Sequence, residues 1–493
     1  MATSITWASV GTLEFGTSEQ PLPLPDDYGM AGYSLGGKKG HAGSQTLYAR
    51  TLALKDAGGE EATLCIVDLM CPSLALFEAV VAKTGIPAER LILAGTHTHT
   101  APGHFYGNSF YRVFAQPLRP DAVFEPNLAW IDELGAAIAA GVSAAWTSLR
   151  PGVVGVGRAD CYGVARNRSE APFASNPEAT AWSAPGMPGE HATAGLHGTR
   201  RAIDPRVTCI AARPTGAGDA AAFAFYACHA TALGPKQTTY HRDWPGYAID
   251  KVESRHPNGV VAALGLGCAG DVSPLPPGEE EGDAQGEPLA QTVGATVGDV
   301  VADILAALPA STTPLTLEVS GGAWAPGATH AWDVGYPILF GAEDGRTELL
   351  GAVLREGMRK REGTRKPGDT QWPKRSVLPL LKRMLRKVGL NPSPWHPLHR
   401  LRLGTHEFVT VPGEPTTVAG FRMEGDALGR PGVSSASLIG YSGDYAGYFT
   451  TAEEYALQHY EGAHTLYGEP TLDLLRAAVG APSPMPPPGA SLP

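Results

Sequence analysis

Two histidines lie two positions apart near the end of an apolar run: His97 and His99 within Leu91–Gly103. An apolar run closed by a turn rich in Gly and Pro is typical of a buried strand that leads into a loop. In an extended chain, residues i and i+2 point to the same side, so we expect both imidazoles to face one point. That arrangement suits two metal ligands, or one ligand and one proton-transfer group, whereas ordinary surface or core histidines are the alternative.

Two further strand-end turns carry possible ligands. His229 ends the apolar run that begins at Phe223, and Glu414 follows the run Glu407–Val411. Two histidines and one glutamate, with a position left for water, form the ligand set of a hydrolytic zinc site. The sequence therefore offers a hydrolytic metal centre, provided that these turns meet in space.

A fourth turn, Gly267–Pro274, contains small residues and the hydroxyl of Ser273. Such a turn allows close approach of the backbone to a substrate. It lacks the G-x-S-x-G spacing of a nucleophile elbow, which disfavours a serine hydrolase.

The composition describes a globular chain that is acidic overall. The 493 residues are 43% hydrophobic and 18% charged, and the formal net charge of −11 argues against a nucleic-acid partner. No long uninterrupted apolar stretch indicates a transmembrane segment. No secretory signal is visible, so we expect a cytoplasmic location, or secretion if a leader has been removed. The six cysteines lack CxxC spacing, which favours buried thiols in a reducing compartment.

Short apolar runs of strand length alternate with Ala-rich stretches of helical length. This alternation predicts the α/β class, with mixed β-sheets, flanking helices and the zinc site at strand ends. The expected strands are Leu91–Gly95, Ala62–Asp68, Val207–Ala211, Ala220–Ala227, Val260–Leu266 and Glu407–Val411, and the clearest helices are Trp130–Ala140 and Ala290–Leu305.

We expect a main α/β catalytic domain over residues 1–400 and a C-terminal part of the same unit over residues 401–480. A Pro-rich tail over residues 481–493 completes the chain. Residues 169–200 are expected to form a lid-like loop, and residues 275–288 an acidic surface loop.

One segment departs from the acidic balance. Arg355–Lys387 holds twelve Lys and Arg residues. Within and just beyond it, apolar residues recur at helical spacing, at Val377, Leu381, Met384, Leu385 and Val388. Such a helix either lies on an anionic membrane surface or packs on the core with a solvated basic face.

Several motifs, taken together and in order, point to a known family. They are Gly95–Gly103, Asn167–Ser169, His229 with Asp243–Tyr247 following, Gly270–Pro274, Pro412–Thr417, Tyr445–Thr451, Glu453–Tyr455 and Tyr460–Gly462. With these motifs the chain resembles the neutral/alkaline ceramidases, zinc-dependent amidases that hydrolyse N-acylsphingosine. The resemblance covers about residues 28–475.

The resemblance implies a role for each matching residue. It implies a Zn²⁺ cofactor with the ligands His97, His229, Glu414 and Tyr448. It implies that His99 activates the attacking water and that Ser273 contacts the substrate. Arg168 and Tyr460 are implied to stabilise the developing oxyanion. Tyr445, three residues from Tyr448, stays an alternative ligand.

Two departures from the family pattern affect the substrate. Leu275 replaces the Asn that follows the Gly-Asp-Val-Ser-Pro turn in the family. We also expect a catalytic domain without the C-terminal immunoglobulin-like domain and signal peptide of secreted members. The leading interpretation is a zinc-dependent, ceramidase-like amidase with a lipid amide substrate and possible contact with a membrane surface. A zinc hydrolase of a soluble amide or ester, and a lipid-binding pseudoenzyme, are the alternatives.

Overall fold

The computed structural model describes most of the chain. The described residues are 4–33, 38–43, 45–107, 109–112, 127–182, 202–275, 286–339, 341–342, 356–361, 363–376, 379, 382–383, 387 and 389–487. Much of the expected lid-like loop, most of the acidic loop and the end of the tail lie outside these residues. The same holds for the five apolar positions of the expected basic helix.

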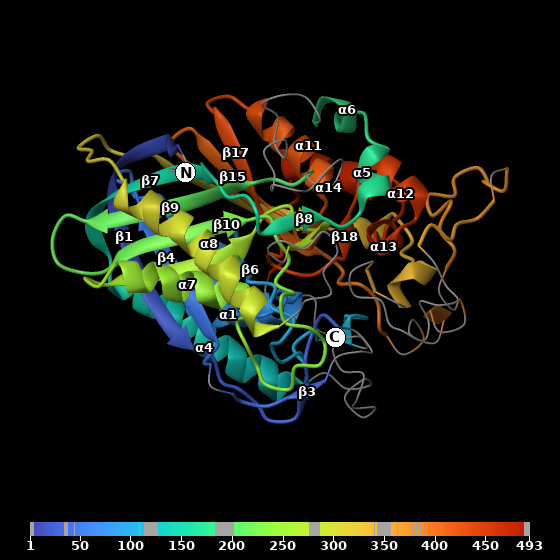
Figure 1. The fold of residues 1–493 in the computed structure, drawn as a ribbon, viewed down its shortest axis with the longest axis horizontal. Helices are drawn as coiled ribbons and strands as arrows, with labels where there is room; N and C mark the ends of the chain where they lie inside the picture. The colour runs from blue at the N-terminus through green and yellow to red at the C-terminus, as the bar shows by residue number, and fades with distance from the viewer. Residues whose placement is uncertain are drawn as a thin grey trace.

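A large mixed sheet forms the centre of the molecule (Figure 1). Its inner pairs are antiparallel, and a parallel pair lies at each edge, β10 with β11 and β5 with β6. In spatial order its strands are β11 (Val260–Leu266), β10 (Ala220–Tyr226), β9 (Arg206–Pro214), β7 (Arg150–Asp160), β1 (Thr6–Pro21), β4 (Tyr48–Lys55), β5 (Glu61–Val67) and β6 (Leu91–Gly95).

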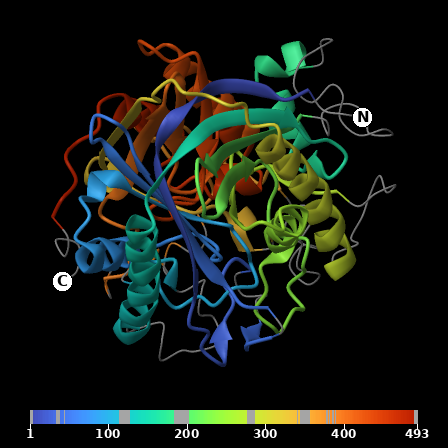
Figure 2. The same ribbon diagram turned by 90° about the vertical axis from the view of Figure 1, so that its left-hand side faces the viewer.

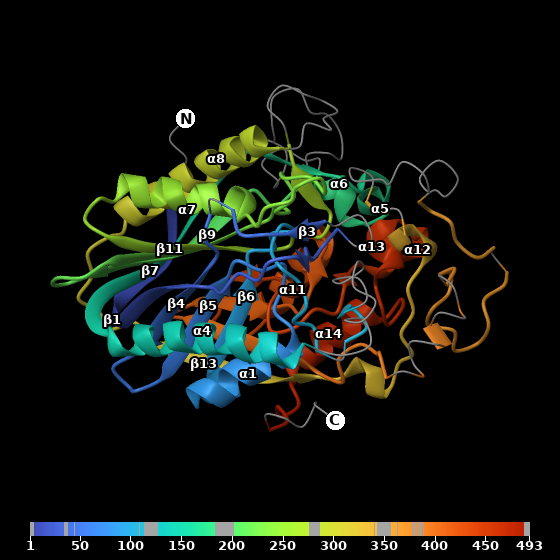
Figure 3. The same ribbon diagram turned by 90° about the horizontal axis from the view of Figure 1, so that it is seen from below.

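Four helices cover one face of this sheet. Helices α1 (Leu74–Thr84) and α4 (Leu128–Thr147) lie along the β1–β6 half. Helices α7 (Asp243–Arg255) and α8 (Glu287–Ala306) lie along the β11–β7 half. Figure 3 shows these two pairs along opposite margins of the sheet. Helices α1 and α7 also supply the crossovers that each parallel edge pair requires.

A smaller sheet packs against the opposite face. Its strands are β13 (Leu317–Trp324), β14 (His396–Leu403), β15 (His406–Thr410) and β17 (Ser435–Ile439). Apolar residues of the two sheets, such as Ile66, Phe223 and Phe408, share one buried cluster. Helices α11 (Thr417–Leu428) and α14 (Thr471–Gly480) lie on the outer face of the smaller sheet. The fold therefore consists of four layers, in the order helices, large sheet, smaller sheet, helices.

Twist of the large sheet brings distant strand ends together. Adjacent strands rotate by roughly 20–25°, which accumulates to about 150° over eight strands. Edge strand β11 accordingly contacts β4, β5 and β6 as well as β10. Figure 2, which looks along the molecule from one end, shows the twist of these strands. Because of it, the carboxyl ends of β6 and β10 meet although the two strands run in opposite senses in the ladder.

Short elements complete the described structure around these strand ends. Two-stranded sheets are formed by β16 (Glu414–Pro415) with β18 (Tyr448–Phe449), β12 (Val272–Pro274) with β8 (Ala165–Asn167), and β2 (Tyr28–Gly29) with β3 (Lys39–Gly40). The remaining described helices are α5 (Glu170–Ala174), α6 (Glu178–Trp182), α12 (Ala452–Leu457), α13 (Tyr460–Ala463), and the 3₁₀ turns Ala88–Arg90, Pro326–Ala328 and Tyr336–Leu339.

The sequence-based expectations agree with this architecture in its main elements. The mixed α/β class is confirmed, and the expected strands and helices match β5, β6, β9, β10, β11, β15, α4 and α8. The expected boundary at residue 400 falls inside β14, so the smaller sheet draws strands from both sides of it. All six cysteines are buried and free.

Two described helices, α4 and α8, are long and apolar enough to cross a membrane by length and composition alone. Neither is an uninterrupted apolar run, because α4 contains Asp132 and Glu133, and α8 contains Asp299 and Asp303. Of their most apolar windows, 50% and 61% respectively are buried against the rest of the fold.

Candidate active site and metal centre

His97 follows β6 and is held by backbone carbonyls. Its amide N–H donates to the carbonyl of Leu69 at 3.0 Å, and its Nδ1 lies 2.8 Å from the carbonyl of Met70. The backbone at His97 has φ of 60°, in the left-handed region. The expectation of an extended chain through His97 and His99 is therefore wrong, because the chain turns at His97 to satisfy these two bonds. The Nε2 atoms still meet, 3.0 Å apart.

His229 is held in a similar way beyond the end of β10. Its Nδ1 lies 2.6 Å from the carbonyl of Ala269 and its amide N–H donates to the carbonyl of Val272 at 3.0 Å. The indole N–H of Trp244 donates to the His229 carbonyl at 2.9 Å. The turn after β11 thus orients the His229 ring, and Nε2 is the atom that faces the site.

Glu414 begins β16 and brings a carboxylate to the two histidines. Its Oε2 lies 2.8 Å from His229 Nε2 and 3.6 Å from His97 Nε2. The preceding Gly413 has φ of 147°, and a Cβ there would lie 2.2 Å from the carbonyl oxygen of Gly447. Only glycine allows the two chain segments to approach this closely. The Pro-Gly-Glu turn is therefore required by the geometry that presents Glu414.

The atoms that converge here are acceptors. Because Nδ1 of His97 and of His229 faces a carbonyl oxygen, Nδ1 carries the proton and Nε2 presents a lone pair. Burial lowers the pKa of His97 well below its ordinary value, although Glu414 opposes the effect, so this imidazole is neutral at neutral pH. Glu414 Oε2 is buried and accepts no aligned hydrogen bond from the described residues. Converging lone pairs repel unless a cation lies between them, so the donor set fits a metal ion.

His99 belongs to the same cluster, at its pocket side. Ligand atoms of His97, His99 and His229 all lie within 4.8 Å of one another, and these residues form a group that is able to hold a metal ion. His99 is 9% exposed, whereas His97 is fully buried. Burial lowers the pKa of His99, as do the charges of His229 and Arg168. The distances alone suit both a third ligand and a proton-transfer group.

Tyr448 lies beside Glu414 because the two residues are register partners in the parallel pair β16–β18. The Tyr448 hydroxyl accepts a hydrogen bond from Arg168 Nη2 at 3.1 Å. The hydroxyl of Tyr445 instead donates to Glu414 Oε1 at 2.5 Å. The two tyrosines therefore differ in position: Tyr445 supports the carboxylate, and Tyr448 faces the guanidinium.

Arg168 follows β8 and is fixed from two sides. Its Nε donates to Glu461 Oε1 at 3.0 Å, and its Nη2 also donates to the carbonyl of Gly270 at 2.7 Å. Glu461 receives a second bond, from the hydroxyl of Ser169 at 2.7 Å. The guanidinium lies 5.7 Å from the centre of the Tyr460 ring. Arg168 is thus a buried, preorganised cation next to the cluster.

The last two predicted site residues differ in placement. Tyr460 begins α13, and its ring centre lies 5.4 Å from that of Tyr448. Ser273 lies on β12, paired in register with Arg166, and its hydroxyl is buried without a hydrogen-bond partner among the described residues. Of these two, only Tyr460 lines the pocket described next.

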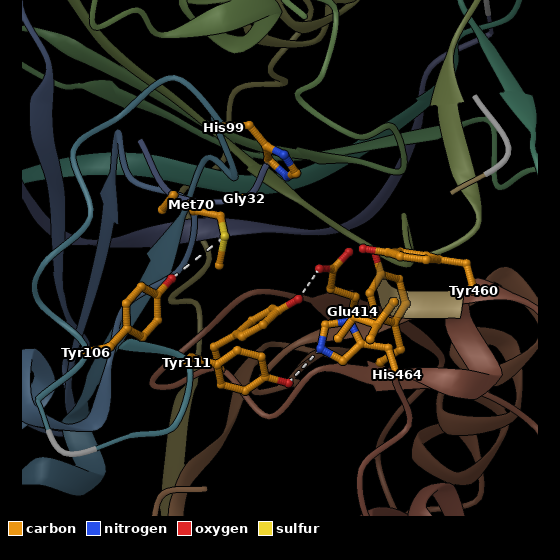
Figure 4. A pocket seen from close by; sticks show the side chains of 12 residues that line it. Gly32, Met70, His99, Tyr106, Tyr111, Glu414, Tyr460 and His464 are labelled. Atoms are coloured by element: carbon orange, nitrogen blue, oxygen red, sulfur yellow. Dashed lines mark hydrogen bonds between the residues drawn. The ribbon is translucent and has the colours of Figure 1, made fainter. Parts of the chain in front are cut away.

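A pocket opens at the cluster and extends away from it between the two sheets' loops (Figure 4). Its wall combines the polar side chains of His99, Glu414 and several tyrosines with the apolar side chains of Met70 and Ile338. The lining residues are Ala31, Gly32, Met70, His99, Tyr106, Tyr111, Ile338, Glu414, Tyr445, Tyr448, Tyr460 and His464.

Sequence reasoning missed several residues that position the site. The sequence marks Tyr445 only as an alternative metal ligand to Tyr448. It marks Glu461 only as part of the motif Tyr460–Gly462. The sequence does not mark Gly32, whose φ is 104° and where a Cβ would lie 2.5 Å from the His99 ring. The His99 ring therefore rests directly on this glycine. Nothing local in the sequence links positions 32 and 99, because the contact is purely tertiary.

Comparison with known proteins agrees with the geometry. A family model described as neutral/alkaline non-lysosomal ceramidase, N-terminal, matches residues 24–291 and 319–477. The neutral ceramidase of Mycobacterium tuberculosis is 26% identical over 489 residues, which cover 90% of this chain and 72% of the relative. The neutral ceramidase of Pseudomonas aeruginosa is 26% identical over 490 residues, which cover 90% of this chain and 67% of the relative.

Solved structures match the fold along nearly the whole chain. A ceramidase complexed with C2 superposes with a TM-score of 0.74 at 22% identity, covering 96% of this chain and 74% of that chain. The neutral ceramidase of Pseudomonas aeruginosa gives a TM-score of 0.72 at 22% identity, with coverages of 98% and 76%. The chain therefore has the mixed α/β fold of these ceramidase structures. The chain belongs to the neutral/alkaline non-lysosomal ceramidase family, and it is an enzyme that hydrolyses linear amides.

Proposed function

We propose that this enzyme is a zinc-dependent ceramidase, which cleaves the amide bond between the fatty acyl chain and the amino alcohol of ceramide. Family membership supports the amide chemistry and the substrate class. The proposed ligands are His97, His229, Glu414 and Tyr448. His99, Arg168 and Tyr460 are the proposed catalytic residues, and Ser273 is a proposed substrate contact.

The single observation that carries the proposal is the convergence of His97 Nε2, His229 Nε2 and Glu414 Oε2. Both histidines are oriented by backbone carbonyls, and the carboxylate lies 2.8 Å from one Nε2 and 3.6 Å from the other. Two imidazoles and a carboxylate are a ligand set of catalytic zinc. Zinc bound there would polarise the amide carbonyl and lower the pKa of water.

The residues of the chain supply the remaining chemistry. His99, neutral and at the pocket side, takes the proton of the attacking water at Nε2 and returns it to the leaving amine, which leaves poorly unless it is protonated. Arg168 stabilises the negative charge that develops on the carbonyl oxygen of the substrate. Its guanidinium does not have to move to do so, because Glu461 and the Gly270 carbonyl already hold it in place. Tyr460 adds a hydroxyl donor from the pocket wall.

The test is hydrolysis of an N-acylsphingosine by the purified chain, before and after removal of metal with a chelator. We expect activity to vanish on chelation and to return with one equivalent of Zn²⁺. His330→Ala serves as a control and should behave like the unmodified chain, because His330 pairs with the Thr329 hydroxyl and is not among the pocket-lining residues. Cleavage of short soluble amides or esters without cleavage of ceramide would favour the first alternative. Ceramide binding without hydrolysis would favour a pseudoenzyme.

The proposal includes contact with an anionic lipid surface, since ceramide resides in membranes. Within the basic segment Arg355–Lys387, Glu356 contacts a pocket residue: its Oε1 accepts a hydrogen bond from the backbone amide of Tyr460. The exposed basic residues among the described part of the segment are Arg359, Arg361, Arg365, Lys366, Arg375, Arg383 and Lys387. Basic residues near an anionic leaflet each contribute about 1 kcal/mol of attraction. The exposed charges therefore favour docking of the molecule on an anionic lipid surface.

A further inference from the structure

The pocket wall includes a histidine that none of the proposed catalytic steps uses. His464 follows α13 and lines the pocket together with Glu414 and Tyr448. Its Nε2 is 2.9 Å from the hydroxyl of Tyr111, which also lines the pocket. Its ring centre lies 5.2 Å from that of Tyr448. His464 is therefore fixed in orientation from two sides, close to the proposed metal ligands.

The second nitrogen of this ring has no hydrogen-bond partner in the described part of the chain. His464 Nδ1 is buried, and the described residues supply no hydrogen bond to it. Figure 4 shows the ring between Tyr111 and Glu414, with one edge bonded to Tyr111 and the other turned toward the carboxylate. Buried polar atoms without a partner are rare and costly, so such an atom in a pocket wall is expected to bind a polar group of a ligand.

We infer that His464 is a specificity-determining residue, whose Nδ1 forms a hydrogen bond with a hydroxyl group on the amine side of the substrate. This inference rests on the proposed function, because it names the part of the amide substrate that the pocket recognises. A neutral imidazole presents one donor and one acceptor nitrogen, and a hydroxyl pairs with either of them. In ceramide, both hydroxyl-bearing carbons are bonded to the carbon that carries the amide nitrogen. A hydroxyl therefore lies close to the scissile bond and to the proposed ligands beside His464.

The rest of the pocket wall favours the same assignment. Tyr106 is paired with the Met70 sulfur, and Tyr445 with Glu414. Met70 and Ile338 are apolar and suit a hydrocarbon chain. The Nδ1 atom of His464 is thus a polar group of the pocket wall that the proposed catalytic steps do not use.

The test compares hydrolysis of an N-acylsphingosine with that of its 1-deoxy and 3-deoxy counterparts, all with the same acyl chain and in the same detergent micelles. We expect kcat/KM of the unmodified enzyme to favour the fully hydroxylated substrate over at least one deoxy counterpart by about 10–100-fold. His464→Phe keeps a ring against Tyr448 but removes both nitrogens. In this variant the ratio should fall toward one, because the hydroxylated substrate alone loses rate.

Controls separate recognition from structure. Tyr106→Phe changes the same pocket and should leave the substrate ratio unchanged. If His464→Phe fails to fold, as judged by thermal unfolding, His464→Asn and His464→Leu replace it, and only His464→Asn should retain part of the ratio.

Equal losses with all substrates would overturn the inference and give His464 a structural role only. An unchanged ratio would also overturn it, and would assign Nδ1 to a bound water. Absence of hydrolysis of every substrate by the zinc-loaded enzyme would instead contradict the proposed function.

Discussion

The site has a histidine half, His97 and His229, and a carboxylate half, Glu414 and Tyr448, and different contacts hold the two halves in place. His97 and His229 extend from the large sheet, and main-chain carbonyls of Met70 and Ala269 orient them. Glu414 comes from the C-terminal part of the chain, and the side chain of Tyr445 orients it. A hydrogen bond to a main-chain carbonyl remains after almost any substitution of the residue that carries the carbonyl. A hydrogen bond from a side chain, such as that of the Tyr445 hydroxyl, disappears when one oxygen atom is removed.

This difference separates what assembles the site from what tunes it. The histidine half depends on the twist of the large sheet and on the turns after β6, β10 and β11. The carboxylate half depends on a network of hydroxyl and guanidinium groups around Glu414 and Tyr448. Groups that orient metal ligands tune the affinity of the site without contributing a ligand. Substitutions in the two halves should therefore differ in kind as well as in size.

The largest effect is expected within the histidine half, where it separates His97 from His99. His97→Ala should lose both bound zinc and activity, because it removes a ligand. His99→Ala should keep zinc and lose about 10²–10⁴-fold in kcat, because it removes only proton transfer. Elemental analysis and single-substrate kinetics on both variants make the comparison. Equal zinc loss in the two variants would assign His99 as a ligand.

The next effect concerns the preorganised cation. Arg168→Gln should lower kcat by about 10²–10³-fold with zinc content unchanged, since one fixed donor to the developing oxyanion disappears. Glu461→Gln, which keeps Arg168 but loosens its support, should cost less. An equal loss in both variants would mean that the ion pair acts as a unit and that Arg168 alone is not the donor.

A smaller effect tests the side-chain support of the carboxylate half. Tyr445→Phe removes the hydroxyl that donates to Glu414 Oε1 and should weaken zinc binding by about 10–100-fold. Competition with a metal-sensitive chelator dye measures this affinity. Tyr106→Phe removes a pocket hydroxyl that contacts Met70 instead, and should leave zinc affinity unchanged. Unaltered affinity in Tyr445→Phe would show that Glu414 needs no support.

The smallest effect is expected outside the pocket. Reversing four of the exposed charges of the basic segment, Arg361, Lys366, Arg383 and Lys387, to Glu should lower activity on anionic vesicles by about tenfold. Hydrolysis of short-chain soluble amides should be unaffected. Added salt should reduce the difference between the two proteins. Equal activity of both proteins on vesicles would remove the membrane-docking part of the proposal.

The two halves also differ in how far the sequence alone could predict them. The histidines follow strands with strong apolar runs, so His97, His99 and His229 could be recognised as strand-end residues. Their exact orientation could not be predicted, because the left-handed backbone at His97 is imposed by Leu69 and Met70 from a neighbouring strand end.

The carboxylate half gave weaker local signals. Strands β16 and β18 are two residues long and show no periodicity. The sequence marks Glu414 only by the apolar run Glu407–Val411 before it, and Tyr448 only by the family resemblance. Their neighbouring positions follow from the register of this pair. The Glu461 and Tyr445 contacts are tertiary hydrogen bonds between distant segments, and no spacing in the sequence encodes them.

X-ray absorption at the zinc edge of the zinc-loaded enzyme tests the central claim most directly. The account predicts two imidazole ligands together with oxygen donors from Glu414 and Tyr448, at about 2.0–2.2 Å from the metal. The same two imidazoles should remain in His99→Ala. Three imidazoles in the unmodified enzyme, falling to two in His99→Ala, would contradict the division of the cluster into ligands and a proton-transfer group.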